Sequence, residues 1–568
     1  MKVESFDVCV VGSGASGAIA AQEIAAHGLR VLVLEEGRTL DPGESLPAIE
    51  SAWETALVPT PGGPLRPLGR PWSASAVGGG TALYAGISFR LRGVDMDARA
   101  HVAPDALDPA WPIGYEELRP YYDRIERCIG VSRAPGTDPL EPPGPPAVMP
   151  AHPYSTQGRL LADSGRRIGL RPFPTPLAIN SVPYAGRPAC VRCGPCNEHV
   201  CPTGARANAA TLLTDAAVPP GALTVAHGAK ALRIVLRDRY RAACVEWLDL
   251  RTRTLRTTRV RCVVLAANAV QSAALLLRSA QPGAENGLGN STDMVGRGLS
   301  FKISGYVSGT VDAGGFATAV PAPEPAEGAS AAEAAEVSPW QGEGDAPTPG
   351  HPDRSSSDHA GPRPHIPGGP FSTVAFSDHY LDPDAPSGLG GLLYEASDED
   401  RALRDGRIRL RVHFLAADQP MRDNAVRLAR ERGPLNLPRL VIDYATHPLD
   451  KRRLGYLSRR ASELLAKAGA DDIRYEDSNY QLGSRHLHGG CRAGTDPAES
   501  VVDPFGRVHD LDNVYVVDGG YFPYSGGVNP TFTIQANALR IARRIAVDLS
   551  AMALLPLVDE RPGPPTAC

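Results

Sequence analysis

The sequence predicts an α/β fold that is built on a parallel sheet, and two observations near its N-terminus carry this prediction. The first is an apolar run at residues 6–11 that breaks into a glycine-rich turn and continues as an alanine-rich helix. The second is another apolar run, at residues 31–34, that ends at Glu35. A strand, a helix and a second strand in this order form a βαβ unit. The turn after the first strand reads Gly12-Ser13-Gly14-Ala15-Ser16-Gly17.

This unit has the glycine spacing of a dinucleotide-binding motif. Gly12 allows a sharp turn, Gly14 lets the backbone approach a pyrophosphate, and Gly17 lets the helix pack closely on the strand. The helix N-terminus faces the phosphate charge, and Glu35 is placed to accept hydrogen bonds from the adenosine ribose. A glycine triplet alone also fits a turn without a ligand, but the strand-turn-helix setting favours the nucleotide.

The bulk properties bound the class of protein. At 568 residues the chain is long enough for two domains, and its net charge of -5 gives no basic field for nucleic acid. We find no apolar run of roughly 18 residues, and the first strand begins too early to leave room for a signal peptide. We therefore expect a soluble cytoplasmic protein with no membrane and no nucleic-acid partner. The ten cysteines, scattered except for one cluster, argue against a secreted disulfide framework.

The composition divides the chain into alternating segments. The nucleotide-binding domain is expected in three parts, and the excursion at 101–220 includes the cysteine-rich segment. The tract at 311–370 is rich in Pro, Ala and Gly, cannot bury enough apolar surface to offset its chain entropy, and is expected to be a flexible insertion. The predicted segments are nucleotide-binding 1–100, 221–310 and 486–550, excursion 101–220, insertion 311–370, a discontinuous α+β substrate domain at 371–485, and a tail at 551–568.

Periodicity predicts the individual elements outside the βαβ unit. We expect amphipathic or apolar helices at 115–129, 450–468 and 529–549. We expect strands of the nucleotide-binding sheet at 223–226, 243–248, 259–266 and 513–518. The alternating segments at 408–414 and 440–444 predict a second sheet in the substrate domain. A second glycine-rich stretch, Gly78 to Gly86, predicts a close approach of the backbone to something flat or charged, or a tight loop.

Four motifs in order resemble the glucose-methanol-choline (GMC) oxidoreductase family: the N-terminal glycine turn, the Gly78 to Gly86 stretch, an H-x-x-G-x-x-R-x-G element from His486 to Gly494, and the run from Asn513 to Thr533. This resemblance implies a GMC-type FAD-binding Rossmann-like domain and a flavoenzyme that acts on alcohols. It makes His486 the catalytic base and Asn529 its partner. An imidazole titrates near neutrality, so it can accept a hydroxyl proton while the carbon delivers hydride to the flavin.

His488 lies two residues after the implied base and is the alternative base, a structural hydrogen-bonding residue or a substrate contact. The resemblance also implies the residues that line the cofactor. These are Gly12, Ser13, Gly14, Ala15, Ser16, Gly17, Glu35, Glu36, Gly79, Gly80, Thr81, Tyr84, Gly86, Ala231, Asn268, Asp518, Gly519, Asn529 and Thr531. Ala493 replaces the usual methionine, and Tyr84 stands where many members have asparagine. No histidine of the Gly78 to Gly86 stretch aligns with the residue that tethers the flavin in some relatives, so we expect noncovalent FAD.

Runs at 173–180, 378–382, 491–494 and 515–520 resemble a subgroup of the family that oxidises paromamine-like amino sugars. The resemblance implies oxidation of a primary 6′-hydroxyl to the aldehyde, with oxygen or another electron acceptor. Other sugars or alcohols, a larger aminoglycoside and a carboxylate product stay open. A polycationic substrate needs carboxylates, and Asp378 and Glu395 are candidates, although a solvated acidic loop explains such residues equally well.

Cys190, Cys193, Cys196 and Cys201 form a C-x2-C-x2-C-x4-C cluster followed by proline. The spacing approaches a ferredoxin pattern but has one residue too many in the last gap. Three readings stay open: an iron-sulfur cluster that carries electrons away from the flavin, a structural zinc site, and thiols or a disulfide without metal. We favour the last.

Overall fold

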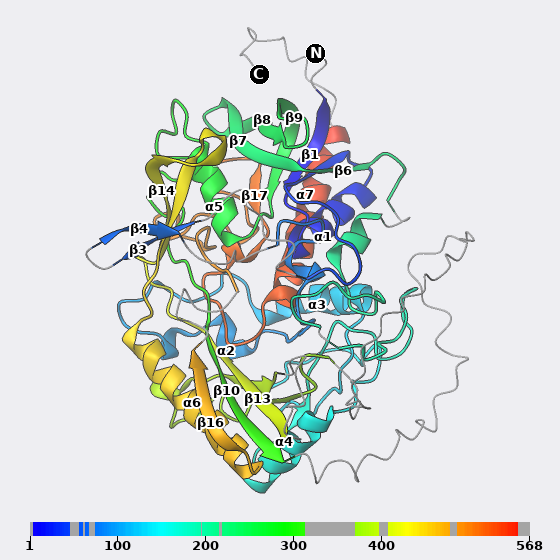
Figure 1. Ribbon diagram of the computed structural model, residues 1–568. Coiled ribbons are helices and arrows are strands. Elements are labelled where there is room, and N and C mark those ends of the chain that lie inside the picture. The colour runs from blue at the N-terminus through cyan, green and yellow to red at the C-terminus, as the bar shows by residue number, and fades with distance from the viewer. Residues whose placement is uncertain are drawn as a thin grey trace, which may run out of the picture.

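The computed structural model describes residues 4–45, 56–60, 63–67, 74–194, 196–214, 218–312, 370–396, 407–477 and 486–554. A seven-stranded sheet with its helices forms one body, and a six-stranded sheet with two further helices forms a second (Figure 1). Of the predicted insertion and tail, residues 313–369 and 555–568 lie outside the described residues. None of the described helices combines the length and the apolarity that a membrane crossing requires.

The seven-stranded sheet has the order β6-β2-β1-β9-β8-β7, and β17 pairs with residues 263–265 of β9, past the residues that pair with β8. The strands β6, β2, β1, β9 and β17 are parallel, whereas β8 and β7 are added antiparallel. Their bounds are β1 Ser5–Val11, β2 Val31–Glu35, β6 Leu223–His227, β7 Ala229–Asp238, β8 Arg241–Asp249, β9 Thr254–Leu265 and β17 Val514–Val516. The apolar runs that predicted β1 and β2 are buried throughout β2 and over most of β1, as expected for central parallel strands.

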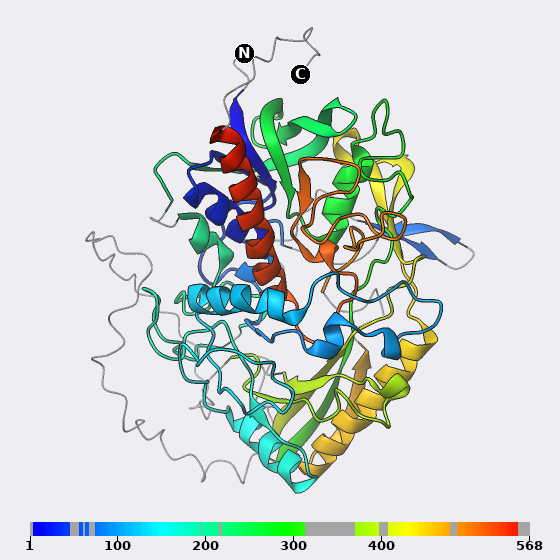
Figure 2. The ribbon, with the colours of Figure 1, turned by 180° about the vertical axis from the view of Figure 1, so that it is seen from behind.

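Three helices pack around this sheet. Helix α1 (Ala15–Ala26) begins directly after the glycine turn and packs against β2 and α7 (Thr531–Leu554). Helix α5 (Ala269–Arg278) follows β9 and packs against β7. Figure 2 shows α7 running along the back of the molecule, with α3 (Tyr115–Ile129) crossing near its start. The bounds predicted for α3 are confirmed.

The six-stranded sheet is antiparallel, with the order β16-β10-β13-β12-β11-β5. Its strands are β5 Phe173–Pro174, β10 Ile303–Asp312, β11 Val374–Phe376, β12 Leu392–Glu395, β13 Arg407–Ala416 and β16 Asp471–Asp477. Helices α6 (Pro448–Lys467) and α4 (Thr156–Arg167) cover one face, where Val307, Val412 and Phe414 join their apolar core. Because strand side chains alternate, Tyr306, Tyr394 and His413 lie on the other face.

Two expectations about this second sheet are corrected. The segments at 408–414 and 440–444 were predicted to share one sheet, but the second belongs to a separate four-stranded sheet, β14-β15-β3-β4. Its strands are β3 Leu57–Thr60, β4 Gly63–Pro67, β14 Ala425–Arg432 and β15 Pro438–Asp443. The reason is that Leu440 and Ile442 pack with Ala274 of α5 rather than with α6. Strand β10, at the end of the segment predicted as nucleotide-binding, pairs with β13 over its whole length.

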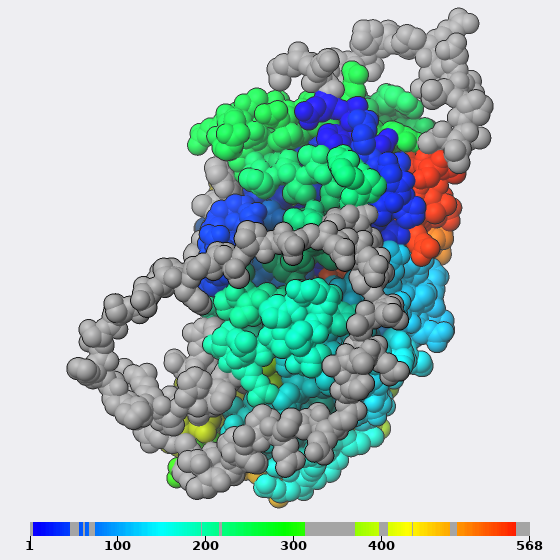
Figure 3. All heavy atoms as spheres, turned by 90° about the vertical axis from the view of Figure 1, so that its right-hand side faces the viewer, coloured from blue at the N-terminus to red at the C-terminus, as the bar shows by residue number. Residues whose placement is uncertain are grey.

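The chain between the two bodies is mostly irregular. It includes the short helix α2 (Gly93–Met96) and α3. Figure 3 shows the cyan and teal residues of this part of the chain on one side of the molecule, next to the blue and green residues of the nucleotide-binding body. This segment brings the cysteine-rich run and the second glycine stretch to the boundary between the two sheets.

Candidate active site

The two glycine-rich stretches meet at the carboxyl end of β1. Gly12 has a φ of +98°, and a Cβ there would lie 2.5 Å from the carbonyl oxygen of Ala266. A Cβ on Gly17 would lie 2.0 Å from the carbonyl oxygen of Gly12. The backbone N–H of Gly78 donates to Ser13 Oγ at 3.1 Å. Only glycine fits at Gly12 and Gly17, and their close backbone contacts give the sharp turn and the tight helix packing of a dinucleotide-binding motif.

Glu35 ends β2 beside this turn and is buried. Its Oε2 accepts hydrogen bonds from the backbone and side chain of Ser13 at 3.0 and 2.6 Å, and its Oε1 accepts one from Gly37 at 2.8 Å. Burial raises the pKa of this carboxyl group, against the hydrogen bonds that lower it. Glu36 instead pairs with Lys230 at 3.0 Å. The structure thus places Glu35, rather than Glu36, against the glycine turn.

The remaining predicted cofactor residues come from several other elements. Asp518 is buried, accepts a hydrogen bond from Ser272 Oγ at 2.5 Å, and has its pKa raised to about 6 by burial. The hydroxyl of Tyr84 is buried without a partner among the described residues, and burial raises its pKa to about 12. The others lie in the short helix Gly79–Ala82 (Gly80, Thr81), at Gly86, in β7 (Ala231), at the N-cap of α5 (Asn268), in the turn Gly519–Tyr521 (Gly519) and at the start of α7 (Thr531).

These residues fit FAD. A Cβ on Gly80 would have nothing within 4 Å, so there is open space beside the second glycine stretch, and the buried carboxylate of Glu35 lies against the glycine turn. The orphaned Tyr84 hydroxyl supplies a hydrogen-bonding group that a polar cofactor would satisfy, since buried polar groups in proteins are nearly always paired.

The predicted base and its partner lie together. His486 Nε2 is 3.5 Å from Asn529 Nδ2, and the structure brings the two residues from separate motifs to one point. The backbone after His486 is anchored on both sides, because His488 exchanges backbone hydrogen bonds with Ser300 and the Gly489 N–H donates to Gly519. The H-x-x-G element therefore positions its first histidine at the edge of the cradle.

The second histidine lies elsewhere. His488 is fully buried, its ring is 5.2 Å from that of Phe522, and neither ring nitrogen has a partner among the described residues. Burial, followed by nearby Lys302, holds the pKa of His488 well below its usual range. His488 is therefore a neutral, enclosed imidazole, and the described residues show no contact between it and Asn529.

Buried charged residues hold the loop that leads to Asn529. The ammonium group of Lys302 donates to the carbonyl oxygens of Ser525 and Gly526. One residue later, the N–H of Gly527 donates to Asp95 Oδ1 at 3.0 Å. Burial lowers the pKa of Lys302 to about 7, against the attraction of nearby carboxylates.

Sequence reasoning missed two residues beside this pair. Tyr394 of β12 lies directly across from His413 of β13, and its hydroxyl forms a hydrogen bond with His413 Nδ1. Burial, followed by nearby His486, holds the pKa of His413 well below its usual range. The available signal was a histidine between Val412 and Phe414 in an otherwise apolar half of a predicted strand.

Glu395 and Asp378, the two carboxylates predicted to bind an amino sugar, form hydrogen bonds with other parts of the protein. Glu395 is buried and accepts hydrogen bonds from Ser155, the N-cap of α4, and from the backbone and hydroxyl of Thr373 at 2.8 and 2.5 Å. Since Tyr394 faces the site, the next residue along the strand faces away from it. Asp378 accepts hydrogen bonds from the backbone and side chain of Arg171 at 3.0 and 2.9 Å. The structure does not bring either carboxylate to the His486 and Asn529 pair.

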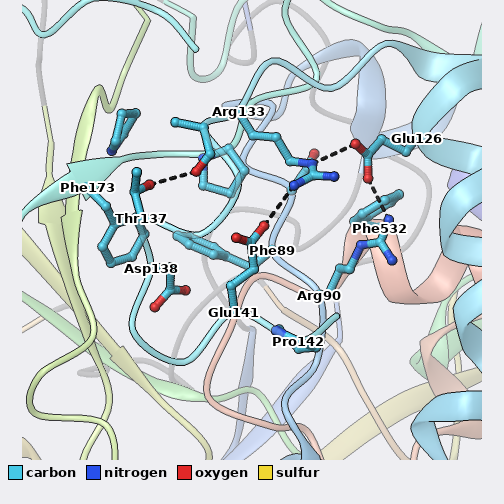
Figure 4. Close-up of a pocket in the computed structure, with 14 residues that line it drawn as sticks. Phe89, Arg90, Glu126, Arg133, Thr137, Asp138, Glu141, Pro142, Phe173 and Phe532 are labelled. Carbon is cyan, nitrogen blue, oxygen red and sulfur yellow. Dashed lines mark hydrogen bonds and ion pairs between the residues drawn. The ribbon is translucent and has the colours of Figure 1, made fainter. Parts of the chain in front are cut away.

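A pocket of about 440 Å³ opens beside the start of α7 (Figure 4). Four of its five charged residues are paired with one another, and the fifth, Asp138, pairs with Arg92. Arg90 and Arg133 each contact Glu126 at 2.6 Å, and Arg133 also contacts Glu141 at 2.9 Å. Phe89, Phe173 and Phe532 supply much of the remaining wall. The ion pairs tie α3 to the neighbouring loop.

None of the four cysteines of the predicted cluster forms a disulfide within the described part of the chain. Cys193 is exposed and the other three are half-buried, and burial raises the pKa of Cys196 to about 12. Within the described part of the chain, no group of three or more Cys, His, Asp or Glu side chains is arranged to hold a metal ion. Arg206 donates to the carbonyl oxygens of Cys196 and Ala82, so this segment is attached to the second glycine stretch.

Comparison with known proteins identifies the family. The GMC oxidoreductase models match residues 69–303 and 420–538, and a model of an NAD(P)-binding Rossmann-like domain matches residues 10–40. A variant of formate oxidase from Aspergillus oryzae has the same fold, with a TM-score of 0.64 and 14% identity over 97% of this chain and 100% of that one.

Two relatives are similar over nearly the whole length. Paromamine 6′-oxidase of Streptomyces fradiae is 43% identical over 96% of this chain and 92% of its own. The 6‴-hydroxyparomomycin C oxidase of Streptomyces lividus is 44% identical over the same shares. With two family models and a site that fits FAD, this chain belongs to the GMC oxidoreductase family, as an FAD-dependent alcohol oxidoreductase.

Proposed function

We propose that this protein oxidises the primary 6′-hydroxyl of a paromamine-like amino sugar to the 6′-aldehyde. The observation that carries the proposal is the His486 and Asn529 pair beside the FAD cradle, in a chain 43% identical to a paromamine 6′-oxidase. The oxidation removes one proton from the hydroxyl oxygen and one hydride from the carbon.

The residues of the pair divide this work. His486 accepts the hydroxyl proton at Nε2, because a neutral imidazole is a suitable base near neutral pH. Asn529 donates an amide hydrogen bond to the substrate oxygen and does not compete for the proton, because an amide is not a base near neutral pH. The buried loop anchors at Lys302 and Asp95 keep the amide in place. When bound, FAD supplies the acceptor for the hydride.

We further propose that FAD is held without a covalent bond. The stretch from Gly78 to Gly86 contains no histidine or cysteine that could form a tether. Precipitation with trichloroacetic acid is expected to release all the flavin into the supernatant. Yellow colour retained in the pellet would contradict this.

A larger aminoglycoside is the second candidate substrate. It is favoured by the 44% identity to an oxidase of 6‴-hydroxyparomomycin C. Oxygen is the proposed electron acceptor, since both of these relatives are named oxidases. A dehydrogenase with another acceptor, and further oxidation of the hydrated aldehyde to a carboxylate, are the alternatives that the assay separates.

The test mixes the purified holoenzyme anaerobically with paromamine or with 6‴-hydroxyparomomycin C while the flavin absorbance is recorded. We expect paromamine to bleach the flavin bands, and air to restore them with formation of hydrogen peroxide and a product of aldehyde mass. Bleaching by the larger compound alone would favour the second candidate. Recovery only with an artificial acceptor would identify a dehydrogenase, and no bleaching by either compound would refute the proposal.

A further inference from the structure

The turn between β11 and β12 places one phenol against the loop that leads to Asn529. Tyr380 is fully buried, and its hydroxyl oxygen accepts a hydrogen bond from the N–H of Gly527 at 2.8 Å. The same hydroxyl donates to Asp95 Oδ1 at 2.5 Å, and this carboxylate oxygen also accepts from the Gly527 N–H at 3.0 Å. The N–H of Gly527 is therefore shared between two oxygens that are hydrogen-bonded to each other.

The loop packs so closely against this phenol that glycine is required. A Cβ on Gly527 would lie 2.5 Å from Tyr380 Oη, and the three atoms nearest to it all belong to Tyr380. At Gly526, where φ is +63°, a Cβ would lie 2.6 Å from the side chain of Leu91. Because protein interiors are close-packed, the phenol limits how far the backbone before Asn529 can move.

Tyr380 is itself held on the face of its ring. The guanidinium carbon of Arg92 lies 4.4 Å from the ring centroid, and Arg92 donates to Asp138 at 2.8 Å. Asp138 accepts a second hydrogen bond, at 2.6 Å, from Ser377. Burial, followed by the Asp95 carboxylate, raises the pKa of Tyr380 well above its usual range, so the hydroxyl keeps the proton that it donates.

The contact with Tyr380 is the anchor of the loop nearest to the amide partner. Lys302 holds the carbonyl groups of Ser525 and Gly526, which lie earlier in the loop. Within the described part of the chain, the N–H of Gly527 is the last backbone group before Asn529 that a side chain holds by a hydrogen bond. Only one residue lies between the two. A shift at this N–H is therefore passed directly to the Asn529 amide.

We propose that Tyr380 is a positioning residue for the oxidation, whose hydroxyl fixes the Gly527 N–H and thereby the place of the Asn529 amide beside His486. This inference rests on the proposed function, in which Asn529 is the partner of the base. The described hydrogen bonds of the Tyr380 hydroxyl do not include either side chain of the pair, so its effect passes through the backbone. A turn of the six-stranded sheet thus completes a site whose two reacting side chains come from the C-terminal motifs.

Site-specific carbethoxylation tests the position of the amide without any substrate. Diethyl pyrocarbonate acylates the neutral imidazole, and His486 is partly exposed whereas His488 is buried. Asn529 Nδ2 lies 3.5 Å from His486 Nε2, so displacement of the amide uncovers that nitrogen. The rate of labelling at His486 in the FAD-loaded protein is followed at fixed pH by tandem mass spectrometry. Asn529→Ala gives the rate for a base without its amide neighbour, and we expect it to exceed the wild-type rate.

Tyr380→Phe removes the hydroxyl and keeps the ring against Arg92. We expect it to raise the labelling rate at His486 by about 2- to 10-fold, the equivalent of one lost hydrogen bond. Tyr456→Phe is the matched control, because this buried phenol donates to the carboxylate of Asp382 in the same turn and has no described contact with the loop. Both variants lose one hydroxyl and should lose similar thermal stability, but the control should keep the wild-type labelling rate.

Flavin reduction separates positioning from a general loss of structure. Tyr380→Phe should lower the limiting rate constant for reduction by paromamine by about 2- to 10-fold, since the amide acts on the oxygen where charge develops. Its FAD content and its Kd for paromamine should stay at the wild-type values. In the Asn529→Ala background, Tyr380→Phe should change neither the reduction rate nor the labelling rate, because the group that it positions is absent.

The labelling rates decide the inference. It is overturned if Tyr380→Phe labels His486 at the wild-type rate, or if its effect adds in full to that of Asn529→Ala. Should Tyr380→Phe fail to fold with FAD, Gly527→Ala takes its place, because the new Cβ would meet Tyr380 and displace the same N–H. An unchanged labelling rate in that variant would also overturn the inference. A wild-type protein that paromamine does not reduce refutes the proposed function, while the labelling result still decides the role of Tyr380.

Discussion

Gly79 lies against Gly14, so close that a Cβ on Gly79 would come within 2.8 Å of the Gly14 Cα. Gly14 caps the N-terminus of α1, and Gly79 begins the short helix of the second glycine stretch. The two motifs that the sequence shows separately are therefore one surface. Their contact brings the phosphate-binding turn to the segment predicted to line the flavin.

Gly79→Ala is expected to weaken FAD binding by at least about 10-fold. The new Cβ would push the two stretches apart, and the φ of +53° is strained for alanine. The ratio of FAD to protein after dialysis, taken from the absorbance at 450 and 280 nm, measures the loss. Gly114→Ala is the control, because Gly114 is not among the cofactor residues, its φ is -93°, and a Cβ there has nothing within 4 Å. Equal FAD content in both variants would contradict a contact that matters for the cofactor.

His486→Ala is expected to slow flavin reduction by about 10²- to 10⁴-fold, the usual contribution of a general base. FAD should remain bound, since His486 is not part of the glycine cradle. Stopped-flow reduction by paromamine measures the rate constant. His488→Asn separates the two histidines of the motif. If that variant lost the chemical step and His486→Ala did not, the assignment of the base would be reversed.

The cysteine segment is expected to contain neither iron nor zinc in stoichiometric amount. The described residues show no disulfide among its four cysteines and no metal-binding arrangement. Metal analysis of the purified protein, and titration of denatured, unreduced protein with Ellman's reagent, check this. Ten reactive thiols are expected from the sequence. A count of eight would indicate one disulfide. Stoichiometric zinc would instead support a structural zinc site, and stoichiometric iron would support an iron-sulfur cluster.

The nucleotide-binding half could be predicted because its signals are local. The strands β1 and β2 are apolar runs, and the turn between β1 and α1 is specified by three glycines. Helix α3 shows its bounds through its amphipathic pattern and its flanking glycines. The identities of His486 and Asn529 came from motif resemblance, and the structure adds that they lie in contact.

The substrate side could not be predicted in the same way. Tyr394 and His413 meet only because β12 and β13 pair in one register, and no pattern within either strand fixes that register. The parallel pairing of β15 with β3 joins residues from distant parts of the chain. Glu395 illustrates the limit, because alternation along β12 decides whether it faces the site or α4.

Lys302 offers a test of how the loop before Asn529 is held. Lys302→Met removes the donor to two buried carbonyl oxygens and leaves Asp418 and Asp95 without their cation, so about 3–5 kcal/mol of stability should be lost. The thermal midpoint, measured by calorimetry, should fall accordingly. Flavin reduction should slow as well, because the loop carries the amide partner.

The size of this loss should depend on pH, with a definite sign. Burial lowers the pKa of Lys302 to about 7 in the folded protein, from 10.5 for the free side chain. Between these values the unfolded chain holds a proton that the folded chain lacks, so raising the pH favours the folded wild type by up to about 1.4 kcal/mol per pH unit. The variant has no such group. The gap in thermal midpoint between wild type and Lys302→Met should therefore widen from pH 7 to pH 9.

The control is Lys451→Met, at an exposed position in α6, for which the gap in thermal midpoint from wild type should not change over this range. A gap for Lys302→Met that stays constant or narrows would show that the ammonium group remains charged throughout, held by its carboxylate neighbours.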